Sequence, residues 1–142
     1  MRIQEIMSRH VELADPNMTI RDIARKMRAE NLGALPIGEN DRLIGMVTDR
    51  DIVMRAVAEE RSAGNTTARD VMSEHVWYCF EYDDVDKAAQ VMAEHQVRRL
   101  PVLNQDKRLV GVVALADLGR KASKAAETAL EGISEPTDKE QR

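Results

Sequence analysis

The sequence has 142 residues, of which 43% are hydrophobic and 32% are charged, with a net charge of −4. This hydrophobic content is enough for a folded core and argues against a disordered chain. The balance of 21 basic against 25 acidic residues argues against a nucleic-acid-binding protein, which normally carries a basic surplus. A single cysteine excludes an intramolecular disulfide, and no apolar run approaches the roughly 18 residues of a membrane span. The N-terminus does not resemble a signal peptide, so we expect a soluble, cytoplasmic protein that binds neither nucleic acid nor membrane.

The chain contains an internal repeat. A shift of 65 positions aligns residues 6–8 with 71–73 and residues 35–37 with 100–102. One extra residue in the second copy then makes the shift 66. The matching stretches are IMS with VMS, LPI with LPV, RLIG with RLVG, and DI with DL. So many matches with a single slip indicate a tandem duplication.

Each copy begins with a short helical lead-in that ends at a Met-Ser pair, followed by a short extended piece at residues 11–14 and 76–80. Apolar residues spaced i, i+3, i+4, i+7 then predict an amphipathic helix. They are Ile20, Ile23, Ala24 and Met27 in the first copy and Val85, Ala88, Ala89 and Met92 in the second. Thr19, three residues before Asp22, predicts the N-cap of the first of these helices. Because Met7, Met27, Met72 and Met92 hold repeat-matched apolar positions, we expect them to be core residues rather than a metal site.

Two apolar runs around the polar turn at residues 38–41 predict a β-hairpin, which the second copy repeats from residue 100 to 113. A closing helix begins near residue 49 and again near residue 115. The predicted fold class is therefore α/β, with tandem β-α-β-β-α repeats related by pseudo-two-fold symmetry. One such unit has little apolar surface, so we expect the two sheets to pack face to face over a shared core.

The domain organisation follows from the repeat. Residues 1–58 form the first repeat, 59–68 a polar linker, and 69–122 the second repeat. Residues 123–142 form an alanine-rich helical extension and a tail. We expect Gly132 and Pro136 to stop the helix. We expect the tail to be frayed from residue 137.

The Met-Ser lead-ins, the LPI and LPV strands and the stretches GMVTDRDI and GVVALADL resemble the CBS-domain family, whose pairs form a Bateman module. The resemblance covers residues 3–122 and is strongest to small stand-alone bacterial CBS pairs, including those of the hypoxic-response type. It implies a regulatory module that binds AMP, ATP or a related adenosyl compound in clefts between the repeats. It also implies a homodimer, no required cofactor, and an unknown downstream partner protein.

The strongest candidate site is the strand-to-helix junction at residues 45–51. A helix start offers free N–H groups to an anion, Thr48 offers a hydroxyl, and the Asp51 carboxylate suits the two hydroxyls of a ribose. The resemblance implies that Asp51 and Thr48 hold the ligand and that Met46 lies against its adenine. Thr48-x-x-Asp51 is equally a plain capping box that needs no ligand, and the sequence leaves both interpretations open.

A second candidate is the pair Arg98 and Arg99, which precedes the LPV strand. The resemblance implies that bases at this place hold the phosphates of a ligand whose ribose the first repeat holds, and arginine suits that task. Side chains of adjacent strand residues point to opposite faces, so only one of the two arginines is expected to reach the ligand. The alternative is that they are solvated charges or partners of acids such as Glu94 and Asp106.

The two repeats are not equivalent at these positions. Ala114 replaces Thr48 in the second copy, although Asp117 matches Asp51. Gly33 and Ala34 stand where the second copy has its two arginines. If a site combines the acid of one repeat with the bases of the other, one phosphate-binding site per chain is complete. The second, at Asp117, would be weak or would accept only a neutral adenosyl group.

The remaining chemistry-bearing residues give weaker signals. All four aromatic residues fall within residues 77–82, either as core packing or as an interface. His10, His75 and Cys79 lack the short spacings of a zinc site, so no metal is expected. No catalytic motif appears, so no catalytic residue and no enzymatic activity are expected. The leading interpretation is a nucleotide sensor, and the alternative is a ligand-free scaffold that dimerises and docks a partner.

Overall fold

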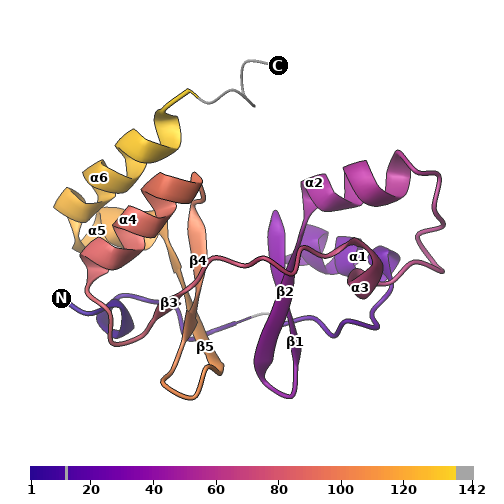
Figure 1. Ribbon diagram of the computed structural model, residues 1–142, viewed down its shortest axis with the longest axis horizontal. Helices are drawn as coiled ribbons and strands as arrows, with labels where there is room; N and C mark the ends of the chain where they lie inside the picture. The colour runs from indigo at the N-terminus through magenta and orange to yellow at the C-terminus, as the bar shows by residue number, and fades with distance from the viewer. Residues whose placement is uncertain (12, 137–142) are drawn as a thin grey trace. The chain divides into compact units, whose positions relative to one another are not determined.

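The computed structural model describes residues 1–11 and 13–136 of the chain (Figure 1). It contains two compact units, of which unit 1 comprises Met1–Val11 and Trp77–Arg142 and unit 2 comprises Glu12–Val76. The first lead-in, residues 3–8, therefore belongs to the unit built from the second repeat. The second lead-in, residues 68–73, belongs to the unit built from the first repeat. The two repeats exchange their lead-ins.

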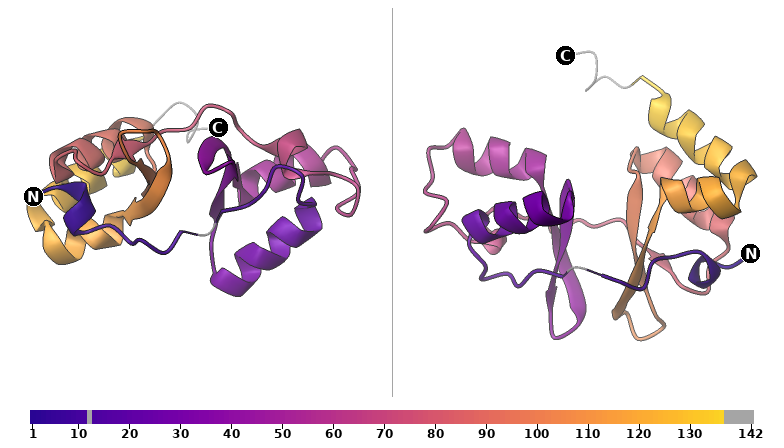
Figure 2. Two further views of the ribbon diagram at one scale, coloured as in Figure 1. Left: turned by 90° about the horizontal axis from the view of Figure 1, so that it is seen from below. Right: turned by 180° about the vertical axis from the view of Figure 1, so that it is seen from behind.

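Unit 2 consists of a β-hairpin covered by helices on one face (Figures 1 and 2). The antiparallel strands pair Leu35 with Val47. Thr19 caps the first helix as predicted, since the Asp22 N–H donates to its Oγ1 at 3.2 Å. The elements are α1 (Ile20–Glu30), β1 (Ala34–Glu39), β2 (Arg42–Thr48), α2 (Asp49–Ile52), its π-helical continuation η2 (Val53–Val57), and α3 (Ala68–Val71).

Unit 1 repeats this plan with a third strand and an additional helix. The strand order is β3-β4-β5, with β3 parallel to β4 and β4 antiparallel to β5. Its helices also cover one face of the sheet (Figure 2). The elements are η1 (Ile3–Glu5), β3 (Cys79–Phe80), α4 (Val85–His95), β4 (Arg99–Leu103), β5 (Leu109–Ala114), α5 (Leu115–Lys121) and α6 (Ser123–Ser134).

The alanine-rich stretch is a separate helix and not an extension of α5. The chain leaves helical geometry at Ala122, with φ −148° and ψ 60°, and α6 begins at the next residue. Of the two predicted stops, Gly132 is wrong because α6 continues to Ser134, whereas Pro136 directly follows the C-cap residue Glu135. A Cβ on Gly132 would collide with Ala93 of α4, so glycine lets α6 approach α4 closely. The tail predicted to fray from residue 137 lies outside the described residues.

Each lead-in pairs with one strand of its unit through two backbone hydrogen bonds. Ser8 exchanges N–H···O bonds of 2.9 Å with Val112 of β5, and Ser73 exchanges bonds of 2.9 Å with Met46 of β2. The segment predicted as a linker contributes too, because the carbonyl of Thr66 accepts the N–H of Ile20 at 2.8 Å. The strand pairing fixes the Met-Ser pairs against the sheets.

The described residues form two hydrophobic clusters, one in each unit. Ile3 and Ile6 of the first lead-in are buried in the cluster of unit 1. Ala68, Val71 and Met72 of the second lead-in are buried in the cluster of unit 2. Each lead-in thus completes the core of the opposite repeat, which extends the limited apolar surface of a single copy. The repeat-matched methionines pack in these cores as predicted.

Candidate functional site

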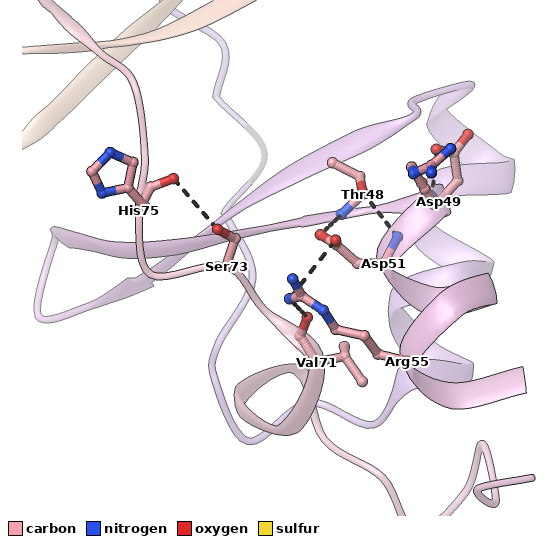
Figure 3. Close-up of polar contacts among 8 residues, drawn as sticks. Thr48, Asp49, Asp51, Arg55, Val71, Ser73 and His75 are labelled. Atoms are coloured by element: carbon pink, nitrogen blue, oxygen red, sulfur yellow. Dashed lines mark hydrogen bonds and ion pairs between the residues drawn. The ribbon is translucent and has the colours of Figure 1, made fainter. Parts of the chain in front are cut away.

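The junction between β2 and α2 is a reciprocal capping box (Figure 3). The Thr48 N–H donates to Asp51 Oδ2 at 2.9 Å, and the Asp51 N–H donates to Thr48 Oγ1 at 3.0 Å. These bonds satisfy two of the amide groups that a helix start leaves without partners. The capping role weighed for Thr48 and Asp51 is therefore present, and it fixes both side chains at the end of the strand.

The capping box leaves polar atoms unused. Asp51 Oδ1 takes no part in it, and an ionised carboxylate has about four acceptor positions in all. Thr48 Oγ1 accepts a hydrogen bond in the box, and in the described part of the chain its hydroxyl donates to no protein group. The Asp51 side chain is 17% exposed, so it is held firmly yet remains reachable. The site therefore offers a carboxylate oxygen and a hydroxyl donor side by side.

Met46 lies two residues before Thr48 on β2. Alternating strand residues share a face, so Met46 and Thr48 are on one side and the buried Val47 is on the other. Met46 is half-buried, and both of its backbone groups bond to Ser73. Three of the predicted residues thus lie together at one end of the hairpin of unit 2.

Arg55 is a component of this site that the sequence reasoning missed. Its guanidinium nitrogen lies 3.8 Å from Asp51 Oδ1 and donates to the carbonyl of Val71 at 2.8 Å (Figure 3). The Asp51–Arg55 spacing of four residues favours an ion pair on a helix and could have indicated half of this arrangement. The bond to Val71 has no local sequence signal because its partner is 16 residues away.

The matching junction in unit 1 is built differently. The Ala114 N–H donates to Asp117 Oδ2 at 2.8 Å, but alanine has no hydroxyl to complete the box. Arg120 donates directly to Asp117 Oδ1, and the Asp117 side chain is only 12% exposed. Both oxygens of Asp117 therefore already accept hydrogen bonds, whereas Oδ1 of Asp51 accepts none.

Arg98 and Arg99 are exposed residues at the start of β4 in unit 1. The Arg98 carbonyl accepts the N–H of Leu115 at 2.8 Å, which ties the strand to α5. Neither guanidinium has a hydrogen-bond or ion-pair partner among residues 1–11 and 13–136. The suggested pairing with Glu94 does not occur, because Glu94 instead contacts Gln90 and His95. Both arginine side chains are therefore exposed to solvent.

The family model of the CBS domain matches residues 3–58 and 68–123. The chain belongs to the CBS-domain family. The two matched stretches are the two copies of the internal repeat, so the chain is a CBS pair with the tandem CBS fold.

Other CBS proteins are similar over nearly the whole chain. The CBS domain-containing protein YhcV of Bacillus subtilis is 40% identical over 134 residues, which cover 93% of this chain and 94% of the relative. The crystal structure of hypoxic response protein I with two coordinated zinc ions has a TM-score of 0.76 at 38% identity and covers 84% of this chain and 98% of that one. The CBS domain pair of protein MJ0100, in complex with 5′-methylthioadenosine and S-adenosyl-L-methionine, has a TM-score of 0.74 at 26% identity and covers 87% and 97%.

Because the structure of hypoxic response protein I contains two zinc ions, the histidines and the cysteine of this CBS pair are candidate metal ligands. Cys79 is buried, and burial, followed by the nearby Asp83 carboxylate, raises the pKa of its thiol to about 12. A thiol that stays protonated is a poor metal ligand. His10 belongs to unit 1 and His75 to unit 2. Within the part of the chain that the structure describes, no three His, Cys, Asp or Glu side chains gather into a metal site.

The four aromatic residues of unit 1 make two sets of ring contacts. The Trp77 ring stacks on His95 with centroids 3.4 Å apart. Phe80 stacks on Tyr82 at 5.2 Å and meets Tyr78 edge-on at 5.5 Å. Trp77, Tyr78 and Tyr82 are 39%, 37% and 45% exposed, so core packing does not account for these three residues.

Among the described residues, no helix is long and apolar enough to cross a membrane.

Proposed function

We propose that this CBS pair is a regulatory module that binds an adenosine nucleotide such as AMP or ATP and changes its packing or dimer geometry in response. The observation that carries the proposal is the Thr48–Asp51 junction, where a carboxylate oxygen and a hydroxyl donor remain available on a rigid support. The related CBS pair with bound 5′-methylthioadenosine and S-adenosyl-L-methionine supports an adenosyl compound as the ligand class. Nothing in the family match or in the described residues indicates catalysis.

Each residue has a distinct role in this proposal. Asp51 accepts hydrogen bonds from the ribose hydroxyls, Thr48 donates its hydroxyl to a phosphate, and Met46 lies against the adenine. One of the two arginines, Arg98 or Arg99, supplies positive charge for the phosphates, and its solvated guanidinium group need not break an ion pair to do so. Asp117 would serve only a second, weaker site, because Arg120 already occupies its Oδ1 and Ala114 supplies no hydroxyl.

A sensor of this kind needs only modest coupling between binding and its response. A coupling free energy of about 1–3 kcal/mol is typical of allosteric proteins and suffices to change affinity or geometry measurably. The response would pass to the partner copy of a homodimer or to a downstream protein. The rival function is a ligand-free scaffold, and the exposure of aromatic side chains within residues 77–82 is the observation that favours it.

A thermal-shift screen with AMP, ADP, ATP, NAD and S-adenosylmethionine separates the two functions. A ligand at 100 times its dissociation constant stabilises a protein by about 2.7 kcal/mol, which corresponds to several degrees in melting temperature. We expect at least one compound to do this for the wild type and for Asp49→Asn, but not for Asp51→Asn. Asparagine at residue 51 can still accept the Thr48 N–H, so the cap survives. No shift with any compound would favour the scaffold.

A further inference from the structure

Arg55 connects the carboxylate of Asp51, the candidate ligand-binding group, to the end of the second lead-in (Figure 3). One guanidinium nitrogen lies 3.8 Å from Asp51 Oδ1 and 2.8 Å from the carbonyl oxygen of Val71. The first distance is too long for a hydrogen bond, so the interaction with Asp51 is an ionic attraction. The second is a short charge-assisted hydrogen bond. One nitrogen atom is therefore shared between two acceptors on separate elements of unit 2.

The Val71 carbonyl marks the last residue of α3. Carbonyl groups at a helix end lack partners within the helix, and a cationic side chain is a common substitute. The next residue, Met72, donates its N–H to the Ala68 carbonyl at 2.8 Å, and Ser73 pairs with Met46 of β2. Residues 71–73 are thus fastened to η2 by Arg55 and to β2 by the Ser73 bridge.

We propose that Arg55 is a positioning residue that orients Asp51 for the ligand. When a ligand binds Asp51, Arg55 also changes how firmly residues 71–73 are held. This inference rests on the proposed function, because it takes Asp51 as the acceptor of ligand hydroxyls. Hydroxyl groups that donate to Oδ1 reduce the pull of that oxygen on the guanidinium, which then bonds more strongly to Val71. Ligand binding therefore tightens the hold on the second lead-in.

The position of this segment in the chain gives the coupling a consequence. Unit 2 ends at Val76 and unit 1 resumes at Trp77, so residues 71–73 lead directly into the second of the two chain connections between the units. Arg55 contacts both the Asp51 carboxylate and Val71, which lies shortly before that connection. Binding at Asp51 thereby acts on one of the two chain connections between the units, a route for the change in packing that a sensor requires.

The first experiment needs no ligand and compares Arg55→Met with Arg50→Met by amide hydrogen exchange. Arg50 is an exposed arginine on the same helix, so its variant removes the same charge. We expect Arg55→Met to speed exchange of the Met72 and Ser73 amides at least about threefold, and Arg50→Met to leave both unchanged. Equal rates in the two variants would overturn the proposal, whatever nucleotide the protein binds.

The second experiment repeats the exchange measurement with saturating AMP and adds calorimetric affinities. In the wild type, AMP should slow exchange at Met72 and Ser73. Arg55→Met should bind AMP about tenfold more weakly and show no slowing even when saturated, and Arg55→Lys should recover part of both effects. A variant that binds and responds like the wild type would contradict the role of Arg55. If the wild type binds neither AMP nor any other compound of the thermal-shift screen, the proposed function and the ligand half of this proposal are overturned, while the first experiment still decides the structural half.

Discussion

The sulfur atom of Met72 lies 2.6 Å from the position that a Cβ atom on Gly45 would occupy. The other repeat has the same arrangement, with the Met7 sulfur 2.8 Å from the corresponding position on Gly111. The carbonyl oxygens of Ser73 and Ser8 are also within 3.0 Å of these two positions. Each glycine therefore provides the space in which the Met-Ser pair of a lead-in packs against a strand.

The first prediction is that Gly45→Ala and Gly111→Ala each destabilise the protein by about 1–3 kcal/mol, because the new methyl group overpacks the lead-in. Gly33→Ala is the matched control, since its Cβ would lie 3.4 Å from the nearest atom, an ordinary contact. Urea denaturation measures all three variants. A neutral effect of alanine at residue 45 would show that the second lead-in does not pack there.

The second prediction contrasts two helical glycines. Gly132→Ala should destabilise the protein, because its methyl group would collide with the backbone and side chain of Ala93 in α4. Gly119→Ala in α5 should instead stabilise it by about 0.5–1 kcal/mol, since nothing lies within 4 Å and alanine is the better helix former. Thermal unfolding compares the two, and effects of the same sign would contradict the close contact between α4 and α6.

The third prediction concerns the thiol of Cys79. A pKa of about 12 leaves roughly a thousandfold less thiolate at pH 8 than an ordinary cysteine has, and the side chain is 2% exposed. A chromogenic thiol reagent at pH 8 should therefore not label the native protein and should label it rapidly in denaturant. Rapid labelling under native conditions would show that β3 is not packed as described.

The fourth prediction is a pH dependence at Asp70. The Thr67 N–H, which donates to the Asp70 carboxylate at 2.9 Å, lowers the pKa of that group below its ordinary 3.8, and Arg61 assists. A lowered pKa in the folded state contributes stability that is present above the ordinary value and is lost as the pH falls through the folded value. Asp70→Asn should therefore lose no more than about 1 kcal/mol at pH 7, because the side chain is 39% exposed and screened.

The measurement is urea denaturation at pH 7 and at pH 3. The wild type should lose more stability between these two values than Asp70→Asn does, since only the carboxylate titrates. A difference between wild type and variant that stays the same at both pH values would contradict an ionised Asp70 as the stabilising group.

Local features of the fold were predictable from the sequence. The spacing of apolar residues predicted the two hairpins and the helices at Ile20–Glu30 and Val85–His95. Thr19 caps the first of these helices as expected. These signals lie within a few residues of the structure they predict. The duplication was equally visible, because it depends only on order and spacing.

Long-range features had no such signal. The bridge between Met46 and Ser73 joins residues far apart in the sequence, so the exchange of lead-ins could not be seen in either stretch alone. The close approach of α6 to α4 explains why Gly132 is a packing residue and not a helix stop. At the candidate site, Thr48 and Asp51 were found by their spacing, whereas the bond from Arg55 to Val71 depends on the folded chain.

Isothermal titration of AMP and ATP tests the central claim most directly. If the Thr48–Asp51 junction and the arginines of the second repeat bind one nucleotide, the stoichiometry should be near one phosphate-dependent site per chain. Asp51→Asn should abolish this binding, and replacing Arg98 and Arg99 by methionine should weaken ATP more than adenosine. Two equivalent phosphate-dependent sites per chain, or no heat of binding at millimolar nucleotide, would contradict the account.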